Sequence, residues 1–527
     1  MTSEAEIRVL PRAFHPPKVE SVRDKVRTLD ELGTIARHHR SAGRSIVQAH
    51  GAFDLLHLGH VRHLEAARRL GDVLVVTVTA DRFVNKGPGR PVFNEGLRAE
   101  MLAALEYVDW VAINPSPDAV SAITAIKPRI YVKGQDYQNP AGDVTGKITA
   151  ERIAVEKYGG LLAFTDEATF SSSELINRHL NVFEPHIREH LSSLRGDGGL
   201  SEILGLLDRV SDYRVLIVGD AIIDEYQYVL PMGKSPKENM IATRYQDEEV
   251  FAGGVFAAAN HVASFCAQVD VVTSLGAVGS FEDAVREQLL PNVRLHNIMR
   301  PGAPTTRKRR FIDPSYMRKL FEVYYIDDDP MSAELQQQID GAIAERVSEV
   351  DVVIAADFGH GLLGPSSIEV LTRGAPFLAV NCQSNSANMG FNLITKYPRS
   401  DYVCIDAPEA RLATGDRTSP IGDIARRIEG LIGCSKIIIT QGKHGCVTHE
   451  RGGVVHTIPA FAKNVVDTVG AGDAFLSVTS PLVAAGGAMH QIGFIGNVVG
   501  ALKVEIVGHR RFIEKPDLVK AITALLK

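Results

Sequence analysis

The sequence predicts an α/β fold divided between two domains. Its 527 residues exceed the length that one hydrophobic core usually serves. Short apolar runs alternate with amphipathic segments, and this alternation stops near residue 178 and resumes near residue 212. Buried strands that alternate with helices are typical of a parallel, doubly wound sheet with helices on both faces. We therefore expect one such sheet in each half of the chain.

The first alternation, over residues 45–178, contains five apolar runs that we expect to be strands. They read SIVQAHG, DVLVVTVTA, VDWVAINPS, RIYVKG and GLLAFTD. Residues 1–44 are polar and include a helical stretch at 28–43, which we interpret as a lead-in to this domain. Helices are expected between the first four runs, at 60–70, 95–107 and 118–126.

The second alternation spans residues 212–527. It follows a mixed, glycine-containing segment at 179–211 that we interpret as a linker. Two strand-rich segments, 226–252 and 305–326, are expected to form a small β-appendage on this domain. Six apolar runs are expected to be strands of the main sheet: YRVLIVGD, VDVVTSLG, DVVIAADFG, PFLAVNCQ, SDYVCID and KIIITQG.

The composition and the charge exclude several classes of protein. The net charge of −6 gives no overall attraction to nucleic acid or to an anionic membrane. The N-terminal residues lack the apolar core of a secretory signal, and no run approaches the length of about eighteen apolar residues that a membrane span needs. The five cysteines are scattered and form no C-x-x-C pair. We expect a cytoplasmic protein with no cysteine metal site, no nucleic-acid partner and no membrane span.

Four histidines fall within AHGAFDLLHLGHVRH, residues 49–63. His57 and His60 occupy a turn between an apolar strand and a helix, where backbone N–H groups can receive a phosphate. Two imidazoles there can donate hydrogen bonds to phosphate oxygens as negative charge develops. A zinc site would need three or four converging ligands, and no H-E-x-x-H pattern is present, so a nucleotide turn is favoured. His63 is expected on the helix surface, and His50 receives no role.

The second half contains the motif VVDTVGAGDAF, residues 465–475. Gly470, Ala471 and Gly472 directly precede a predicted helix, so three consecutive N–H groups can point at one anion. Asp473, at the start of that helix, is placed to take a proton from a substrate hydroxyl.

Several segments of the first domain resemble the cytidylyltransferase-like nucleotidyltransferases. The pattern G-x-F-D-x-x-H-x-G-H at 51–60 matches their H-x-G-H turn, and RPV at 90–92, VKGQDY at 132–137 and FSSSELI at 170–176 match later markers. The resemblance implies a Rossmann-like fold and transfer of a nucleotidyl group from ATP or another NTP, with Mg²⁺ bridging the triphosphate. It assigns catalysis to His57, His60 and Lys86. It assigns nucleotide binding to Gly51, Phe53, Asp54, Gly59, Arg98, Lys133, Ser171, Ser172 and Ser173.

Residues 212–527 resemble the ribokinase-like (PfkB) carbohydrate kinases. Beside the GAGD motif, GDAIIDEY at 219–226, AGGVFAAAN at 252–260 and TQGKHG at 440–445 match their sugar-binding and nucleotide-binding segments. The resemblance implies a ribokinase-like fold whose strand-rich appendage is a β-lid that joins two subunits into a homodimer. It assigns catalysis to Asp473 and an indirect role in Mg²⁺ binding to Asp406 and Glu409. It assigns nucleotide binding to Thr440, Gly442, Gly445, Gly470, Ala471 and Gly472, and sugar binding to Asp220, Asp224, Gly253, Gly254 and Asn260.

Together the two halves resemble the bifunctional heptose-phosphate kinase/heptose 1-phosphate adenylyltransferases, with the domains in reverse order. The resemblance implies phosphorylation of a sugar phosphate at its anomeric hydroxyl, activation of a sugar 1-phosphate with release of pyrophosphate, and a separate phosphatase between the two steps. Four places depart from that pattern: His360 replaces a lysine, NCQS at 381–384 replaces D-P-K-G, Asp406 replaces an asparagine, and SPKEN at 235–239 replaces a segment that normally continues differently. A second interpretation therefore stays open, an active transferase that uses ATP or CTP and another sugar phosphate or a polyol phosphate, beside a weak or regulatory kinase-like domain.

Overall fold

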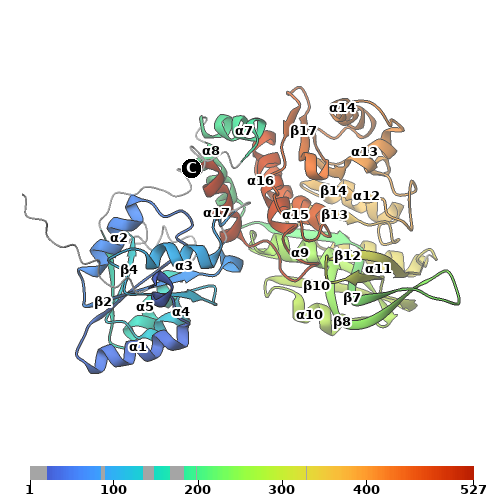
Figure 1. The fold of residues 1–527 in the computed structure, drawn as a ribbon. Helices are drawn as coiled ribbons and strands as arrows, with labels where there is room; N and C mark the ends of the chain where they lie inside the picture. Colours follow the sequence, from blue (N-terminus) through green and yellow to red (C-terminus); the bar gives the residue numbers. More distant parts are fainter. Residues whose placement is uncertain (1–20, 85–89, 135–146, 166–182, 197–198, 328) are drawn as a thin grey trace, which may run out of the picture. The chain divides into compact units, whose positions relative to one another are not determined.

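The computed structural model describes residues 21–84, 90–134, 147–165, 183–196, 199–327 and 329–527. Contacts divide them into two compact units that meet in the sequence at residues 176 and 177 (Figure 1). Each unit contains its own strands, helices and buried core, so the predicted α/β class is confirmed in both.

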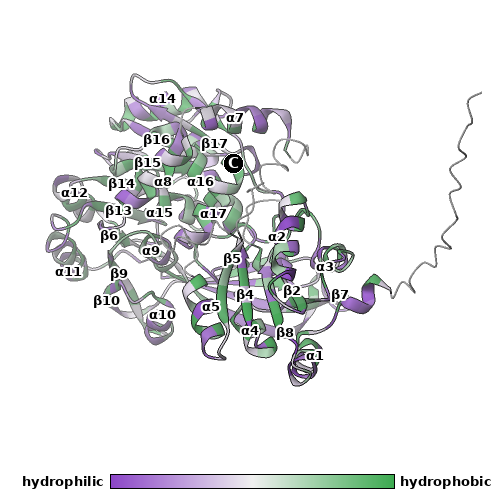
Figure 2. Ribbon diagram, turned by 90° about the vertical axis from the view of Figure 1, so that its left-hand side faces the viewer, coloured by the Kyte–Doolittle hydropathy of each residue, from purple (hydrophilic) through white to green (hydrophobic). Residues whose placement is uncertain are grey.

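The first unit is built on a parallel sheet of five strands in the order β3-β2-β1-β4-β5. Chain order reverses between β1 and β4, and the carboxyl ends of strands at such a reversal form the usual ligand crevice of an open α/β sheet. The strands are largely hydrophobic, as β4 and β5 show in Figure 2. The elements are β1 (Ile46–Gly51), β2 (Val73–Thr79), β3 (Trp110–Asn114), β4 (Ile130–Gly134) and β5 (Leu161–Thr165), with helices α1 (Leu29–Ser41), α2 (Leu58–Arg68), α3 (Glu95–Ala103), α4 (Val120–Ile126) and α5 (Lys147–Glu156).

The second unit contains a sheet of nine strands in the order β10-β9-β6-β13-β14-β15-β16-β17-β18. The first seven are parallel, and β17 and β18 continue the sheet as antiparallel strands. The strands are β6 (Arg214–Gly219), β9 (Gln268–Val278), β10 (Val293–Pro304), β13 (Val352–Asp357), β14 (Leu378–Cys382), β15 (Tyr402–Asp406), β16 (Lys436–Thr440), β17 (Cys446–Glu450) and β18 (His456–Ile458).

Helices cover both faces of this sheet and bury two separate hydrophobic clusters against it. One face packs against α9 (Val255–Ala263), α10 (Glu282–Gln288), α15 (Ala471–Ala484), α16 (Met489–Lys503) and α17 (Lys515–Leu526). The other face packs against α11 (Ala333–Ala344), α12 (Pro365–Gly374), α13 (Ala407–Thr414) and α14 (Ile421–Ile432). This double burial explains why the strand sequences are apolar runs and do not alternate.

The two strand-rich segments form the expected small sheet, in the order β12-β11-β7-β8. Its strands are β7 (Ala221–Lys234), β8 (Ile241–Gly254), β11 (Arg307–Asp313) and β12 (Arg318–Tyr325). We call this sheet the lid. Strand β7 follows β6 after one residue, Asp220, so the lid grows directly from the carboxyl edge of the main sheet.

The segment expected as a linker contains two helices, α7 (Pro185–Gly196) and α8 (Gly199–Arg209). Their apolar side chains, including Leu191 and Leu206, are buried in the core of the second unit. Arg195 on α7 donates a hydrogen bond from Nη2 to the carbonyl oxygen of Leu525 on α17 at 2.8 Å. Both helices therefore belong to the second unit, although no apolar run of the kind that predicts a strand precedes them in the sequence.

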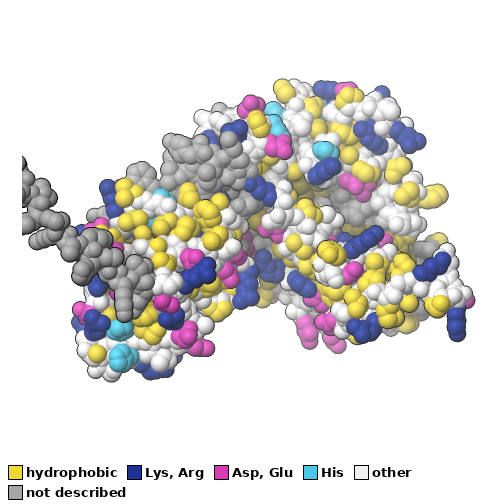
Figure 3. All heavy atoms as spheres, viewed as in Figure 1, with side chains coloured by type: hydrophobic (Ala, Val, Ile, Leu, Met, Phe, Trp, Pro, Cys, Tyr) yellow, Lys and Arg dark blue, Asp and Glu magenta, His cyan; other side chains and the backbone are white. Residues whose placement is uncertain are grey.

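Among the described residues, no helix combines the length and apolar character needed to cross a membrane. On the face drawn in Figure 3, basic and acidic side chains are interspersed, in keeping with the small net charge.

Candidate active sites

In the first unit, the turn after β1 brings His57 and His60 together. His57 is the N-cap of α2, and its Nδ1 accepts a hydrogen bond from the backbone N–H of Gly59 at 3.1 Å. The two imidazoles are stacked, with their ring centroids 4.0 Å apart. Phe53 has a left-handed backbone with φ of 47°, and its ring packs edge-on against His60. Positive φ in a bulky residue is uncommon and is concentrated at functional turns.

Arg98 lies beneath this turn rather than in a crevice. Its side chain is fully buried, and Nε donates to the carbonyl oxygen of Phe93 at 2.9 Å. The other guanidinium nitrogens bind the carbonyl oxygens of Ala52 and Thr79 and the carboxylate of Asp81. Arg98 therefore holds the backbone of the turn, a role that the sequence pattern did not distinguish from nucleotide binding.

Asp54 also acts on the backbone near the turn. Its carboxylate accepts hydrogen bonds from Arg90 Nη1 at 2.9 Å and from the backbone N–H of Val92 at 2.6 Å. It thereby fastens the RPV segment to the H-x-G-H turn. Gly51 ends β1 immediately before this region.

His50 points into the sheet. Its Nδ1 and Nε2 lie 2.9 and 3.3 Å from the hydroxyl oxygens of Thr77 and Thr79 on the neighbouring strand β2. Burial, together with the charge of Lys133, holds the pKa of His50 well below its ordinary value. His50 is thus a neutral, hydrogen-bonded residue at the end of β1.

The expected surface position of His63 is wrong. Its Nδ1 lies 2.7 Å from Thr165 Oγ1 at the end of β5, because this face of α2 turns toward the sheet. Burial and the charge of Lys133 lower the pKa of His63 to about 4. Lys133 itself forms an ion pair with Glu151 on α5, with Nζ and Oε2 3.0 Å apart.

Lys86 and the three serines Ser171, Ser172 and Ser173 lie outside the described residues. Within the described part of the chain, no three His, Cys, Asp or Glu side chains are arranged as a metal site.

In the second unit, a cavity of about 320 Å³ opens at the carboxyl ends of β14, β15 and β16. It brings together, among the residues expected at the site, Asp224, Gly254, Asp406, Glu409, Thr440, Gly470, Gly472 and Asp473. Ala471 is the first residue of α15, whose N-terminus faces this cavity. Gly442 and Gly445 lie with positive φ in the loop that follows β16.

Asp473 lies in the first turn of α15, where it is partly buried and lines the cavity. Burial raises its pKa, and the nearby His509 opposes this rise. Its Oδ1 accepts a hydrogen bond from Gln383 Nε2 at 2.7 Å. Gly470 is required at the helix start, because its φ is 74° and a Cβ there would lie 2.5 Å from the ring of His509. Gln383 and His509 were not expected at the site.

Asp224 is held between two cationic or hydrogen-bonding groups. It forms an ion pair with Arg310, and its Oδ2 lies 3.2 Å from Nε2 of His509. Burial alone would raise the pKa of Asp224, but Arg310 and His509 outweigh it and hold the pKa well below the ordinary range. Gly253 is close by, since a Cβ there would overlap the Asp224 carboxylate.

Asp220 and Asn260 do not line this cavity. The Asp220 carboxylate accepts hydrogen bonds from the backbone N–H groups of Phe358, His360 and Leu362, at 3.0, 3.3 and 3.1 Å. Burial, with the nearby charge of Asp357, raises its pKa to about 6. Asn260 bonds to the backbone of Gln288 and Leu290 at the end of α10. Both side chains therefore hold the backbones of neighbouring loops and do not contact the cavity.

Two cations of the lid line the cavity, and the strand alternation of β11 selects them. Lys308 and Arg310 face the cavity, whereas Arg307 and Arg309 both bind Glu225 on the other face of the lid. Lys308 is 7% exposed, and within the described residues its Nζ forms no hydrogen bond or ion pair. The run of basic residues at 307–310 is visible in the sequence. Only the alternation of side chains between the two faces of a strand shows which of them line the cavity.

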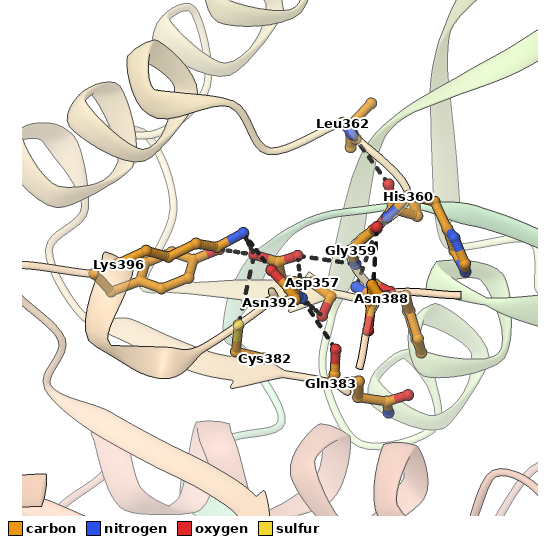
Figure 4. Close-up of polar contacts among 12 residues, drawn as sticks. Asp357, Gly359, His360, Leu362, Cys382, Gln383, Asn388, Asn392 and Lys396 are labelled. Carbon is orange, nitrogen blue, oxygen red and sulfur yellow. Dashed lines mark hydrogen bonds and ion pairs between the residues drawn. The ribbon is translucent and has the colours of Figure 1, made fainter. Parts of the chain in front are cut away.

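The loop carrying His360 is fixed by a polar network around Asp357 (Figure 4). The Asp357 carboxylate binds Lys396 Nζ at 2.5 Å and Asn392 Nδ2 at 3.0 Å, among other partners. The imidazole of His360 points away from this network, and its Nε2 is buried with no hydrogen-bond partner among the described residues. Burial and the charge of Lys308 lower its pKa to about 3.

Asp406 and Glu409 form a capping box at the start of α13. Both oxygens of Glu409 accept backbone hydrogen bonds, from Ser384 and Asp406, while Asp406 accepts one from Glu409 through Oδ1. Burial and the charge of Asp406 raise the pKa of Glu409 to about 8. Two carboxylates that share a cavity with Asp473 suit a hard cation such as Mg²⁺, and their backbone hydrogen bonds favour contact with it through water.

Comparison with known proteins matches both units to families. The model described as "pfkB family carbohydrate kinase" matches residues 213–516, and the model described as "Cytidylyltransferase-like" matches residues 49–178. Curated relatives named "Bifunctional protein HldE" match the N-terminal part. The protein from Trichlorobacter lovleyi is 43% identical over 147 residues, 27% of this chain and 28% of that protein; the protein from Methylobacillus flagellatus is 43% identical over 159 residues, 30% and 31% of the two chains. The matched segment thus spans less than a third of these relatives.

Solved structures of low sequence identity are similar to part of the chain. Phosphofructokinase-2 from Escherichia coli in complex with substrates and products is 12% identical, with a TM-score of 0.49, and the match covers 60% of this chain and 100% of that one. Arabidopsis thaliana ribokinase complexed with ribose and ATP is 17% identical, with a TM-score of 0.44, covering 60% and 99%. Because the family model alone spans more than half of the sequence, the chain belongs to the pfkB family of carbohydrate kinases, with a cytidylyltransferase-like domain preceding the kinase domain.

Proposed function

We propose that the protein makes a nucleotide-activated sugar with two active sites on one chain. The second unit transfers the γ-phosphoryl group of ATP to the anomeric hydroxyl of a sugar phosphate, of the heptose 7-phosphate kind. The first unit then transfers a nucleotidyl group, from ATP, to the resulting class of sugar 1-phosphate and releases pyrophosphate. A separate phosphatase acts on the sugar between these steps, and the protein works in the cytoplasm.

The observation that carries the kinase proposal is the cavity shared by Asp473 and Lys308. A partly buried carboxylate beside a glycine-rich helix start can accept a hydroxyl proton next to a bound anion. The Lys308 ammonium is buried and forms no direct ion pair within the described residues, so it is suited to an anionic group on the other substrate. A sugar phosphate supplies both the hydroxyl and the anion, which a neutral sugar does not.

In the kinase step, the Asp473 carboxylate takes the proton of the anomeric hydroxyl. The sugar oxygen attacks the γ-phosphorus, the bond to the β-phosphate oxygen breaks, and ADP leaves. Backbone N–H groups at residues 470–472 stabilise the charge on the transferred group. Asp406 and Glu409 would hold Mg²⁺ through water, and this ion supplies neutralisation of phosphate charge when it is bound.

In the transferase step, the phosphate of the sugar 1-phosphate is itself the nucleophile. Its oxygen attacks the α-phosphorus of the nucleotide, and pyrophosphate leaves. His57 and His60 are placed to donate hydrogen bonds to the α-phosphate oxygens as charge develops there. No covalent intermediate with the protein is needed.

We also propose a homodimer formed through the lid. Its strands and the turn between β7 and β8 expose several large apolar side chains, which are costly to leave in water on a monomer. These residues are Met232, Met240, Ile241, Tyr245, Phe321 and Val323.

The test is a product screen with the full chain. We expect ADP and a sugar bisphosphate from ATP and heptose 7-phosphate, and pyrophosphate with a nucleotide sugar from ATP or CTP and heptose 1-phosphate, both identified by mass spectrometry. Asp473→Asn should abolish the first product and leave the second unchanged. Nucleotidyl transfer without phosphorylation of any sugar phosphate would instead establish the alternative, a regulatory kinase-like domain.

A further inference from the structure

Lys503, the last residue of α16, is a lysine with no exposed surface in the second unit. Its Nζ donates hydrogen bonds to the carbonyl oxygens of Val469 and Gly508, at 2.8 and 2.7 Å. Isolated ammonium groups are very costly to bury, so a buried lysine is expected to have a specific structural or functional partner set. Here the partners are the backbones of two loops that border the kinase cavity.

The same two loop residues are held from their other side by Asp467. Its Oδ1 accepts a hydrogen bond from the N–H of Val469 at 3.2 Å, and its Oδ2 accepts one from the N–H of Gly508 at 2.8 Å. Lys503 binds their carbonyl groups and Asp467 binds their N–H groups. We call this arrangement the Asp467–Lys503 clamp.

Each clamped residue directly precedes a residue of the active site. Val469 precedes Gly470, which opens the anion-binding turn, and a Cβ on Gly470 would lie 3.4 Å from Cε of Lys503. Gly508 precedes His509, which contacts Asp224 and fills the space beside Gly470. A shift of either backbone would therefore move the anion-binding turn or the partner of Asp224.

The clamp also reaches the lid. The second interaction of each Asp467 oxygen comes from a lid strand, Lys319 Nζ on β12 at 2.7 Å and the Tyr226 hydroxyl on β7 at 2.6 Å. Burial lowers the pKa of Lys503 to about 8, and the negative charges of Asp467, Asp473 and Asp224 oppose this fall and favour the charged ammonium. It thus offsets negative charge at the point where an anionic nucleotide and sugar must enter.

We propose that Lys503 is a positioning residue for phosphoryl transfer. Its charged ammonium holds the backbones of Val469 and Gly508 so that the anion-binding turn and His509 stand in register with Asp473. This proposal rests on the proposed kinase activity and concerns only the second unit.

The test compares Lys503→Met with Lys515→Met in the full chain. Lys515 lies in the same C-terminal region, and its ammonium binds Asp208 and Ser211 instead of loops of the cavity. We expect kcat for sugar phosphorylation to fall about 10²-fold in K503M, since a displacement of about 1 Å at a reacting centre has that effect, with a smaller change in KM for the sugar phosphate. K515M and the nucleotidyl transfer of both variants should keep wild-type rates.

A second variant separates charge from packing. Lys503→Ala leaves a space between two carbonyl groups, and methylammonium added to the assay should restore part of the lost kcat. Tetramethylammonium, which cannot donate a hydrogen bond, should not. A K503A enzyme that methylammonium fails to restore would reduce Lys503 to a packing residue and overturn the proposal.

The remaining outcomes are also decisive. A folded K503M with wild-type kcat overturns the proposal while leaving the kinase function intact. If K503M does not fold, Lys503→Gln, which keeps a donor without the charge, replaces it, and failure of all three variants to fold makes Lys503 a stability residue and overturns the proposal. A wild-type chain that phosphorylates no sugar phosphate removes the kinase function and this inference with it.

Discussion

Gln383 donates a hydrogen bond from its amide to the carboxylate of Asp473 at 2.7 Å. Gln383 belongs to the segment NCQS, one of the places where the chain departs from the D-P-K-G pattern of the kinases it resembles. This departure therefore places a different side chain next to the proposed base, Asp473. A neutral amide beside a carboxylate stabilises its ionised form less strongly than a cation would.

This contact gives a prediction about pH. The hydrogen bond lowers the pKa of Asp473, so Gln383→Ala should raise that pKa and leave less carboxylate at a given pH. The acid limb of the kcat profile for sugar phosphorylation should therefore move to higher pH. Gln336→Ala, which removes an amide bound to Asp340 and Ser367 on α11 and α12, is the control. An unchanged acid limb in Q383A would contradict the assignment of Asp473 as the base.

Neighbouring side chains of β11 lie on opposite faces of the lid, and this gives a pair of predictions about substrate binding. Lys308→Met removes the cation that faces the cavity, and KM for the sugar phosphate should rise at least about tenfold, the equivalent of one charge-assisted hydrogen bond. Arg309→Met removes the neighbouring cation, which binds Glu225 on the other face, and should leave KM unchanged. Steady-state kinetics with varied sugar phosphate distinguishes the two. Equal effects of both variants would argue against a phosphate contact by Lys308.

The histidine pair predicts that the two activities separate. His57→Ala and His60→Ala should each lower the rate of nucleotidyl transfer about 10²- to 10³-fold, the usual loss when a donor to a developing anion is removed. Sugar phosphorylation should be unaffected. His38→Ala, at an exposed position of α1, is the matched histidine control. Pyrophosphate release by H57A at the wild-type rate would exclude His57 from the reaction.

Asp220 predicts an effect on stability rather than on binding. Its carboxylate accepts three backbone hydrogen bonds, and an amide in Asp220→Asn has one oxygen to serve them. The second unit should lose about 1–3 kcal/mol of unfolding free energy, the cost of leaving a buried donor unsatisfied. Denaturant unfolding, followed by a spectroscopic signal that reports on the second unit, measures this loss of unfolding free energy. A D220N protein of unchanged stability but raised KM would restore the sugar-binding assignment that the sequence suggests.

Much of the architecture was predictable because both sheets are buried on two faces. Apolar runs such as DVLVVTVTA and KIIITQG could only be interior strands, and each is a strand of the structure. The helices α5, α7 and α8 were missed or taken for linker, since their apolar positions are spread among polar ones and become a buried face only in the folded unit. The strands β10, β17 and β18 at the two ends of the larger sheet were also missed, so local pattern best located the buried central strands.

For the sites, motifs located the segments but did not define what each side chain contacts. The pattern around Gly470 correctly located a helix start with an aspartate in its first turn. The motifs did not show that Arg98 donates its hydrogen bonds to backbone carbonyl groups. They also did not show that Lys503 lies inside the protein, because a charged residue in a sequence is ordinarily assigned to the surface. Those contacts depend on residues far apart in the chain, which no local spacing records.

The contact between α7 and α17 has a consequence for truncation of the chain. Arg195 near the end of α7 binds the carbonyl oxygen of Leu525 near the end of α17, so the first and last helices described in the second unit are held together. The apolar side chains of α7, α8 and α17 all belong to one buried cluster. A truncation that removes α17 would therefore expose apolar surface on the two helices that begin this unit as well.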